Sequence, residues 1–385
     1  METSTDRILT THVGSLPRSR KVTEAVFAKE NGELDDECAL QETVKQAVQA
    51  VVRRQVEAGV DVVSDGEMSK ISYATYIKDR MTGFAGDSPR KPPADLEEFP
   101  GFLERQARSG GTPSYKRPRC TGEIKVKDQE QLNRDIANFI SALAADKPAE
   151  GFLTAASPGV IALFQPNEYY PDHESYLLAL AEAMQVEYEA IVDSGCLLQL
   201  DAPDLGLGRH MMFKDRDDEE YVRLANLHVD ILNHALRNIP AERMRLHVCW
   251  GNYEGPHHHD APMEMVLPIA LRARPQALLF EAANPRHAHE WEVFKKSHIP
   301  EDKVLVPGVI DSTTNFIEHP RLVAERICRF ADIAGRERVI AGTDCGFSTF
   351  AGFGAVDEDI VYAKLAALAE GARLAGERLW RRSAA

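Results

Sequence analysis

Eight short apolar runs alternate with longer amphipathic segments along this chain, and this alternation limits the fold more than any other feature of the sequence. The runs occupy residues 8–14, 60–64, 151–155, 197–201, 245–250, 277–281, 304–309 and 338–342. Most of them are dense in Val, Ile and Leu, which is typical of parallel strands buried on both faces. Eight such strands separated by helices in 385 residues favour a single α/β (β/α)8 TIM barrel over an open sheet.

The segments between the runs carry apolar residues at helical spacing. They occupy residues 41–58, 176–194, 220–238, 263–272, 319–334 and 359–379. The first two are followed directly by Gly59 and Gly195, and a glycine after the last periodic residue is a common helix stop. These segments therefore predict helices that return the chain from one strand to the next.

One segment, residues 83–133, interrupts the alternation between the second and third predicted strands. It is rich in Pro, Gly and charged residues, and it is too long for a plain connection. We interpret it as an excursion over the barrel mouth, within a single domain that spans residues 1–385. A disordered surface insertion is the alternative, because segments of this composition often do not pack.

The composition argues against several classes of protein. The formal net charge is −15, whereas a protein that binds nucleic acid needs a basic surface for the phosphates. No stretch approaches the ~18 consecutive apolar residues of a membrane span, and residues 1–15 lack the basic and then apolar pattern of a signal peptide. The six cysteines are irregularly spaced, unlike a disulfide framework. We therefore expect a reduced, cytoplasmic protein with no nucleic-acid or membrane partner. The composition leaves the oligomeric state open, including a homo-oligomer.

Polar and thiol side chains follow nearly every predicted strand and are almost absent inside the strands. Barrel enzymes carry their catalytic groups at the carboxyl ends of the strands, so this distribution indicates an active site. In chain order the strand ends read VGSLPR (13–18), SDGE (64–67), SPG (157–159), LDAPD (200–204), HVCWGN (247–252), FEAANPRH (280–287), PGVID (307–311) and GTDCGF (342–347).

Four of these strand-end residues are of the types that bind zinc. His247 and Cys249 are two residues apart on one strand, so their side chains point to the same face. Cys345 and Glu281 end two other strands, and thiolate, imidazole and carboxylate are all zinc ligands. A lone H-x-C pair usually only fills space in the core, and Cys345 alone could be a small buried hydrophobe. The convergence of four potential ligands at the strand ends of one barrel favours a metal site.

The run His257–His258–His259–Asp260 is a second group that could bind metal. It could equally form hydrogen bonds with the metal ligands without binding the ion itself, or pack on the barrel mouth. We assign the zinc to the strand ends and leave the role of this run open.

Together these strand-end motifs resemble the C-terminal catalytic barrel of cobalamin-independent methionine synthase, in order and in strand placement. The resemblance covers essentially the whole chain, and the family's large N-terminal duplicate barrel is absent. It implies a zinc site formed by His247, Cys249, Glu281 and Cys345. The same branch of the family includes epoxyalkane:coenzyme M transferase, which acts on another thiol.

The resemblance also implies a substrate pocket. Val13, Gly14 and Ser15 match the family's loop for the substrate carboxylate, Glu67 matches a family glutamate, and Asp201 matches the aspartate that holds the amino group of homocysteine. Two acidic groups at strand ends suit an ammonium group. The alternative is that each one pairs with a nearby cation, such as Arg18, Lys70 or Arg209.

Two residues depart from the family pattern. Thr313 stands about where the full-length enzyme has a histidine, and Phe164 stands where a tryptophan of the pterin wall is expected. Both changes concern the side of the methyl donor, and neither touches the zinc or the thiol pocket.

The resemblance and the motifs together predict a zinc-dependent thiol alkyltransferase. The expected reaction is methyl transfer from a 5-methyltetrahydropteroyltriglutamate-type donor to homocysteine, giving methionine, because a zinc-bound thiol is deprotonated at neutral pH. Addition of a thiol to an epoxide is one alternative, and a non-catalytic zinc-binding barrel is another. Glu281 is the ligand expected to yield to the thiol. Asp311 and Asp344 are expected to transfer protons or to orient ligands, with capping of the following loops as the alternative.

Overall fold

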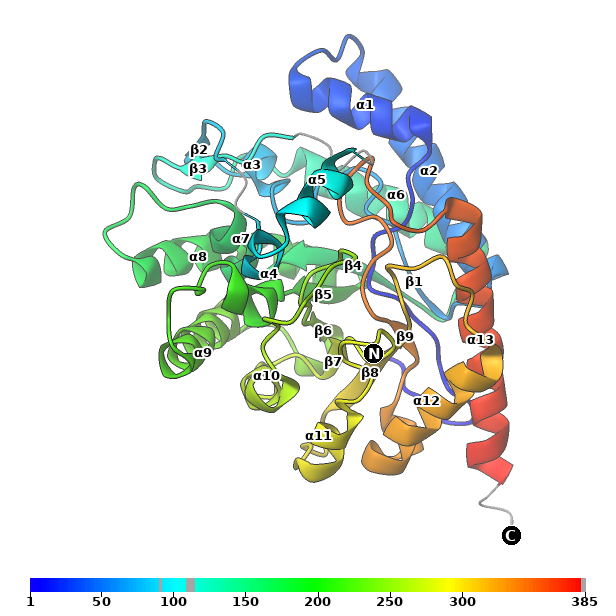
Figure 1. The fold of residues 1–385 in the computed structure, drawn as a ribbon. Helices are drawn as coiled ribbons and strands as arrows, with labels where there is room; N and C mark the ends of the chain where they lie inside the picture. Colours follow the sequence, from blue (N-terminus) through cyan, green and yellow to red (C-terminus); the bar gives the residue numbers. More distant parts are fainter. Residues whose placement is uncertain (90–91, 109–114, 382–385) are drawn as a thin grey trace.

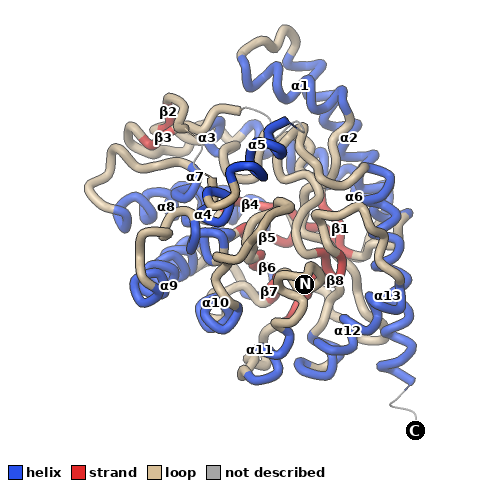
Figure 2. Tube along the Cα trace, in the orientation of Figure 1, coloured by secondary structure: helices blue, strands red, loops and turns tan. Residues whose placement is uncertain are grey.

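Seven parallel strands form one curled sheet at the centre of the molecule, and helices surround it (Figures 1 and 2). The computed structural model describes residues 1–89, 92–108 and 115–381. Neighbouring strands follow the order β1-β4-β5-β6-β7-β8-β9. Their bounds are β1 Val62–Ser64, β4 Glu150–Ala156, β5 Leu197–Asp201, β6 Met244–His247, β7 Ala277–Phe280, β8 Val304–Ile310 and β9 Gly342–Thr343.

The start of the chain closes this sheet into a ring. Thr10 forms a parallel bridge with Ala341, next to β9, and Thr11 forms one with Val62 of β1. The backbone N–H of Thr11 donates to the carbonyl of Ala341 at 2.8 Å, and the N–H of Val62 donates to the carbonyl of Thr10 at 3.0 Å. The prediction of a TIM-barrel-like α/β fold is therefore confirmed. The first predicted strand, 8–14, takes its expected place but pairs only through isolated bridges.

The helices of the outer layer begin and end near the predicted bounds, with shifts that the caps explain. The segment predicted at 41–58 begins earlier, at Glu37, because the side chain of Asp36 accepts a hydrogen bond from the N–H of Ala39. The helices α1, α3, α6, α7 and α11 were not predicted, and α6 begins at Glu130, inside the segment predicted as an excursion up to residue 133. The helices are α1 Arg20–Asn31, α2 Glu37–Glu57, α3 Ile77–Arg80, α6 Glu130–Asp146, α7 Pro158–Phe164, α8 His173–Asp193, α9 Asp218–Ala235, α10 Met263–Ala270, α11 Trp291–Lys296, α12 Pro320–Ala334 and α13 Glu358–Arg381.

The described part of the 83–133 segment contains short elements of its own. They are the antiparallel pair β2 (Phe84–Ala85) and β3 (Arg119–Cys120), and the helices α4 (Ala94–Glu97) and α5 (Pro100–Arg108). Leu96 of α4 and Leu103 of α5 line the same cavity as His247 and Cys249. The segment therefore reaches the carboxyl ends of the strands, while its assignment as an excursion within one domain stays a prediction. No helix of the described residues is long and apolar enough to cross a membrane.

The interior of the ring contains a buried arginine, which ties the closing segment to the opposite side of the barrel. The Arg245 guanidinium donates to Thr11 Oγ1 at 3.0 Å and to the carbonyl of His12 at 2.8 Å. It also lies 3.9 Å from the ring centre of Phe152. Thr11 Oγ1 in turn donates to the carbonyl of Val62 at 2.9 Å. This one hydroxyl therefore joins the closing segment to β1 and to β6.

We expect Thr11→Val to destabilise the fold, because the substitution keeps the shape of the side chain and removes both hydrogen bonds. A buried donor left without a partner costs about 1–3 kcal/mol, so the urea midpoint of unfolding should fall. Thr5→Val is the matched control, since Thr5 is exposed and its side chain has no hydrogen bond among those found. Equal midpoints for the two variants would show that the Thr11 hydroxyl does not stabilise the closure.

Candidate functional site

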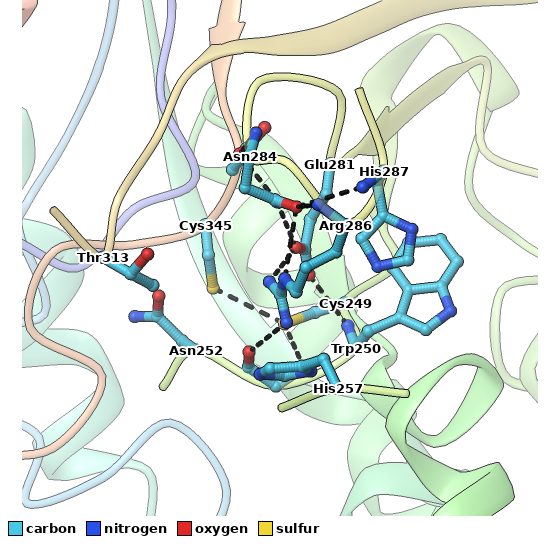
Figure 3. Close-up of polar contacts among 12 residues, drawn as sticks. Cys249, Trp250, Asn252, His257, Glu281, Asn284, Arg286, His287, Thr313 and Cys345 are labelled. Atoms are coloured by element: carbon cyan, nitrogen blue, oxygen red, sulfur yellow. Dashed lines mark hydrogen bonds and ion pairs between the residues drawn. The ribbon is translucent and has the colours of Figure 1, made fainter. Parts of the chain in front are cut away.

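His247, Cys249 and Cys345 come together at the carboxyl ends of their strands. Their ligand atoms all lie within 4.8 Å of one another, and each residue is at most 5% exposed. The two sulfur atoms are 3.6 Å apart (Figure 3). Tetrahedral zinc with Zn–S bonds of about 2.3 Å places two sulfurs about 3.8 Å apart. The spacing of the thiols therefore fits such an ion.

The ring of His247 is held in the orientation that a metal ligand needs. Its Nδ1 lies 3.1 Å from Asp201 Oδ1, and the two residues are register partners in β6 and β5. Because a carboxylate oxygen only accepts, Nδ1 carries the proton and Nε2 is left with a free lone pair. Nε2 is buried and has no hydrogen-bond partner. A carboxylate–histidine–metal arrangement would satisfy this atom.

The two thiols favour a cation between them. A hydrogen bond with Cys249, together with burial, raises the pKa of Cys345 well above its usual value. Two adjacent buried thiolates would repel each other without a positive charge, whereas a coordinated divalent metal deprotonates thiols outright. The donor set of one imidazole and two thiols is one that zinc prefers. The residues present therefore fit a bound metal.

Glu281 lies beside this group but is not part of it. Its Oε1 accepts from the N–H of Trp250 at 3.0 Å, and its Oε2 accepts from Asn284 Nδ2 at 2.7 Å. Oε2 also forms an ion pair with Arg286 (Figure 3). The carboxylate is thus satisfied by protein donors, and its role as fourth metal ligand stays a prediction.

Asp344 holds the loop that carries Glu281. Its two oxygens accept from the backbone N–H groups of Ala282, Ala283 and Asn284, each at 2.8 Å, and from Asn284 Nδ2 at 2.9 Å. Burial and the charge of Glu281 raise the pKa of Asp344 to about 7, and the hydrogen bonds from Ala282 and Ala283 act in the opposite direction. These contacts place Asp344 as a support of the site.

Asp311 follows β8 and contacts its own loop. Its Oδ1 accepts from the backbone N–H and the hydroxyl of Thr313, both at 2.8 Å, and its Oδ2 accepts from Thr314 Oγ1 at 2.8 Å. Thr313 is therefore fixed beside Asp311, and its correspondence with the family histidine stays a prediction. The geometry matches the capping alternative for Asp311, and a part in proton transfer stays a prediction.

A cavity of about 420 Å³ opens onto the metal-ligand group. His247, Cys249 and Cys345 line it together with the predicted substrate residues Val13, Ser15, Glu67 and Asp201. Gly14 does not line the cavity. It packs so closely against Thr154 that an added Cβ would lie 2.6 Å from Thr154 Cγ2. The structure thus brings three of the four predicted metal ligands and four of the five predicted substrate residues to one cavity, while Glu281 and Gly14 do not line it.

Glu67 presents an unpaired oxygen in this region. Its backbone has a φ of 59°, which is rare for a residue with a side chain and marks a locally strained conformation. Oε1 accepts from Thr154 Oγ1 at 2.8 Å, while Oε2 is buried and has no partner. Burial raises the pKa of Glu67 to about 7, against the lowering effect of Lys70. An additional positive group would therefore stabilise this carboxylate.

The outer part of the cavity is apolar and aromatic. It is lined by Tyr73, Leu96, Leu103, Phe164, Leu207, Met211, Phe350 and Phe353. Phe164, predicted from the resemblance, packs edge-on against Tyr73 with ring centres 5.8 Å apart. Tyr73 and Phe350 were not predicted, because they lie in loops where spacing gives no signal.

The histidine run divides into a buried and an exposed part. His257 is buried and contacts Asp260, with Nδ1 3.0 Å from Oδ1. His258 and His259 are exposed and contact Glu98. None of the three lies within the group formed by His247 and the two cysteines.

His287, which sequence reasoning missed, supports the loop after β6. Its Nδ1 lies 2.6 Å from Glu290 Oε2 and its Nε2 lies 3.1 Å from Asp260 Oδ2. Burial alone would lower its pKa, but these hydrogen bonds outweigh burial and raise the pKa to about 10. The centre of its ring lies 4.5 Å from that of Trp250. The backbone N–H of Trp250 donates to Glu281. The imidazolium therefore stabilises the wall behind the metal ligands.

The amino-acid sequence is similar to those of known enzymes. Residues 8–91 match the model of the family described as "Cobalamin-independent synthase, Catalytic domain". A methionine synthase of Saccharolobus solfataricus is 25% identical over 376 residues, which cover 97% of this chain and 96% of that protein. A methionine synthase of Sulfolobus acidocaldarius is 27% identical over 340 residues, covering 88% of this chain and 85% of that protein.

Two solved structures share the fold. A B12-independent methionine synthase from Shewanella sp. W3-18-1, in complex with selenomethionine, has a TM-score of 0.73 at 17% identity and covers 97% of this chain and 99% of its own. A putative vitamin-B12 independent methionine synthase from Listeria monocytogenes has a TM-score of 0.63 at 19% identity, covering 95% and 98%. These likenesses support the TIM-barrel-like architecture.

We expect His287→Gln to lower the free energy of unfolding most strongly at low pH. The folded pKa of about 10 lies above the ordinary 6.5, so the charged form stabilises the fold fully below pH 6.5, and this contribution is lost as the pH rises to about 10. Breaking a buried ion pair costs about 3–5 kcal/mol, which urea unfolding at several pH values would resolve. His298→Gln, at an exposed histidine, should change little. A deficit independent of pH would mean that His287 is neutral.

Proposed function

We propose that this chain, which is similar to a methionine synthase of Saccharolobus solfataricus over 97% of its length and matches the cobalamin-independent synthase model over residues 8–91, is a zinc-dependent methyltransferase that converts homocysteine to methionine. The observation that carries the proposal is the shared cavity, in which a buried His–Cys–Cys group faces two buried carboxylates. One end of that cavity suits a thiol held by a metal, and the other suits an ammonium group.

The metal would be held by His247, Cys249 and Cys345, with Glu281 as the fourth ligand. Bound there, zinc would let the substrate thiol exist as a thiolate at neutral pH. Asp201 orients the His247 ring through its 3.1 Å contact with Nδ1. Arg286 holds the Glu281 carboxylate, so this ligand can yield to the thiol without leaving an unpaired charge in the protein interior.

The amino-acid end of homocysteine would bind between Glu67 and Asp201. Arg18, Lys70 and Arg209 are the three cations expected as alternative partners of these acids, and the hydrogen bonds of each go to other groups. Arg18 donates to the backbone carbonyl of Glu67 at 2.6 Å, Lys70 donates to the carbonyl of Thr154 at 2.6 Å, and Arg209 pairs with Asp218 at 2.8 Å. The free Oε2 of Glu67 is thus available to a ligand ammonium, and the substrate carboxylate would lie at Val13–Ser15. That a related structure binds selenomethionine supports an amino-acid ligand.

In the proposed reaction the homocysteine thiol loses its proton and its sulfur forms a bond to the methyl carbon. The bond between that carbon and the donor breaks, and the donor keeps the electron pair and takes up a proton. The aromatic rings of Tyr73, Phe164 and Phe350 border the cavity and would pack against the flat ring system of a methyl-folate-type donor.

A second candidate reaction is addition of a thiol to an epoxide or another alkyl donor. Thr313, which stands where the family has a histidine, and Phe164, which stands where it has a tryptophan, favour this alternative. A sulfonated thiol would need a cation in the cavity, and Arg117 is the cation among the lining residues. It lies in the aromatic outer part, beside Phe164, so we rank homocysteine first.

We expect the parent protein to keep its zinc during treatment with a weak chelator, and we expect Cys249→Ser and Cys345→Ser each to lose it. Such a site holds about one ion per chain and needs both thiolates. Elemental analysis gives the metal content, and circular dichroism tests that the fold persists. Cys196→Ser is the control, because Cys196 is a buried cysteine outside the site and should keep the ion. A Cys345→Ser protein with full zinc would refute the assigned ligands.

We expect Glu67→Gln to weaken the binding of homocysteine selectively. Loss of one partner of a desolvated charge pair costs about 2–5 kcal/mol, which at about 1.4 kcal/mol per decade is roughly one and a half to three and a half decades in Kd. Mercaptoethanol lacks the ammonium group and should bind the variant as it binds the parent, as followed by proton release on thiol addition. Asp201→Asn is less selective, since Asp201 also orients His247. An equal loss for both thiols would assign Glu67 a purely structural role.

A further inference from the structure

Among the described residues, a second group of metal-ligand side chains lies outside the cavity. His258 Nε2 is 3.0 Å from Glu98 Oε2, and His259 Nε2 is 2.5 Å from Glu98 Oε1. The three ligand atoms lie within 4.8 Å of one another, and all three residues are exposed. This group shares no residue with the buried site formed by His247, Cys249 and Cys345.

The rings of the two histidines lie side by side, next to a residue with an unusual backbone conformation. Side chains of consecutive residues normally diverge, yet the rings of His258 and His259 lie 4.2 Å apart. The preceding residue, His257, has a φ of 53°, a conformation that costs roughly 1–3 kcal/mol in a residue with a side chain and persists only when the surroundings enforce it. The strained residue directly precedes the pair in the chain.

The contacts of His257 enforce this conformation. Its ring stacks on Tyr253 with centres 4.0 Å apart. Its Nδ1 lies 3.0 Å from Asp260 Oδ1, and its Nε2 lies 3.0 Å from the carbonyl oxygen of Tyr253. Its backbone N–H donates to Asp95 Oδ2 at 2.9 Å. The pair is therefore preorganised by buried groups, in contrast to two surface histidines that meet by chance.

We propose that Glu98, His258 and His259 bind a divalent transition-metal ion, with water completing the coordination. In tetrahedral coordination with bonds of about 2.0–2.1 Å, neighbouring ligand atoms are about 3.3 Å apart. The two N–O separations of 3.0 and 2.5 Å need to widen only slightly. The ion would replace the protons that now lie between the imidazoles and the carboxylate. Two imidazoles and a carboxylate suit zinc, nickel, cobalt or copper rather than magnesium or calcium.

The position of the site gives the bound ion a structural consequence. Glu98 directly follows α4, whereas His258 and His259 belong to the loop that follows Cys249. Tyr253 and Asp95 already join the same two segments, with the hydroxyl 2.8 Å from Asp95 Oδ2. Leu96 of α4 lines the cavity. The ion would therefore fasten α4 to the loop beside the buried site.

Calorimetric titration of the protein already loaded with zinc tests the binding. Nickel added to this protein should bind as about one further equivalent per chain, since the set offers a single group of ligands. His258→Ala/His259→Ala should abolish this second uptake, and His298→Ala, which removes another exposed histidine, should keep it. Absence of a second equivalent in the parent, or its persistence in the double variant, would overturn the proposal.

Cobalt distinguishes this site from the buried one. Cobalt at the buried group should show a thiolate-to-cobalt charge-transfer band, whereas cobalt at Glu98, His258 and His259 should not. Cys249→Ser should remove the band and leave the second uptake unchanged, so the surface site and the proposed methyltransferase site can fail independently. Loss of both uptakes in Cys249→Ser would contradict a separate site.

Hydrogen exchange tests the fastening of α4. With nickel bound, the amides of α4 and of the loop at 251–262 should exchange more slowly than in the presence of a chelator. The His258→Ala/His259→Ala protein should show the same exchange in both conditions. Nickel binding without slower exchange in α4 would refute the structural consequence.

Discussion

The carboxylate of Asp344 connects loops that lie on either side of β8, and the geometry of the candidate site depends on it. From β9 the side chain crosses β8 and accepts four N–H groups of residues 282–284. The crossing is possible because β8 has a glycine at this level: a Cβ on Gly308 would lie 2.3 Å from Asp344 Oδ1. Cys345 is the next residue, so the same contact fixes the distance between a thiol and the loop of Glu281.

Around this connection the molecule concentrates negative charge in a confined volume. Glu67, Asp201 and two thiols line the cavity, Glu281 is buried nearby, and desolvation penalises each of these groups in its charged form. Only Glu281 has a cation, Arg286, in direct contact. A metal ion and a ligand ammonium would offset much of the remaining charge. The net charge of −15 for the chain thus has a local counterpart at the site, and its partial neutralisation favours the binding of cations.

The sequence predicted those features that follow from the regular geometry of a parallel barrel. His247 and Cys249 could be placed on one face because side chains alternate along a strand, and Cys345 could be placed beside them because strand ends share one rim. The ion pair of Glu281 with Arg286 could not be predicted, since it depends on how one loop folds back on itself. The meeting of Glu98 with His258 and His259 escaped prediction for the same reason. The first strand was placed correctly, but its reduction to two bridges depends on how far each neighbouring strand extends.

The pairing of Thr10 and Thr11 with both ends of the sheet determines when the complete site can form during synthesis of the chain. Thr10 and Thr11 bridge residues near both β1 and β9, so the segment that leads to Val13 and Ser15 lies against the last strand of the barrel. In a chain leaving the ribosome the first segment can pair with β1 early, but its partner beside β9 is missing until residues beyond 341 have emerged. Cys345 arrives at the same late stage, long after His247 and Cys249. Metal capture by the full donor set is therefore tied to completion of the barrel, and a truncated chain lacks both the closing strand and one thiol.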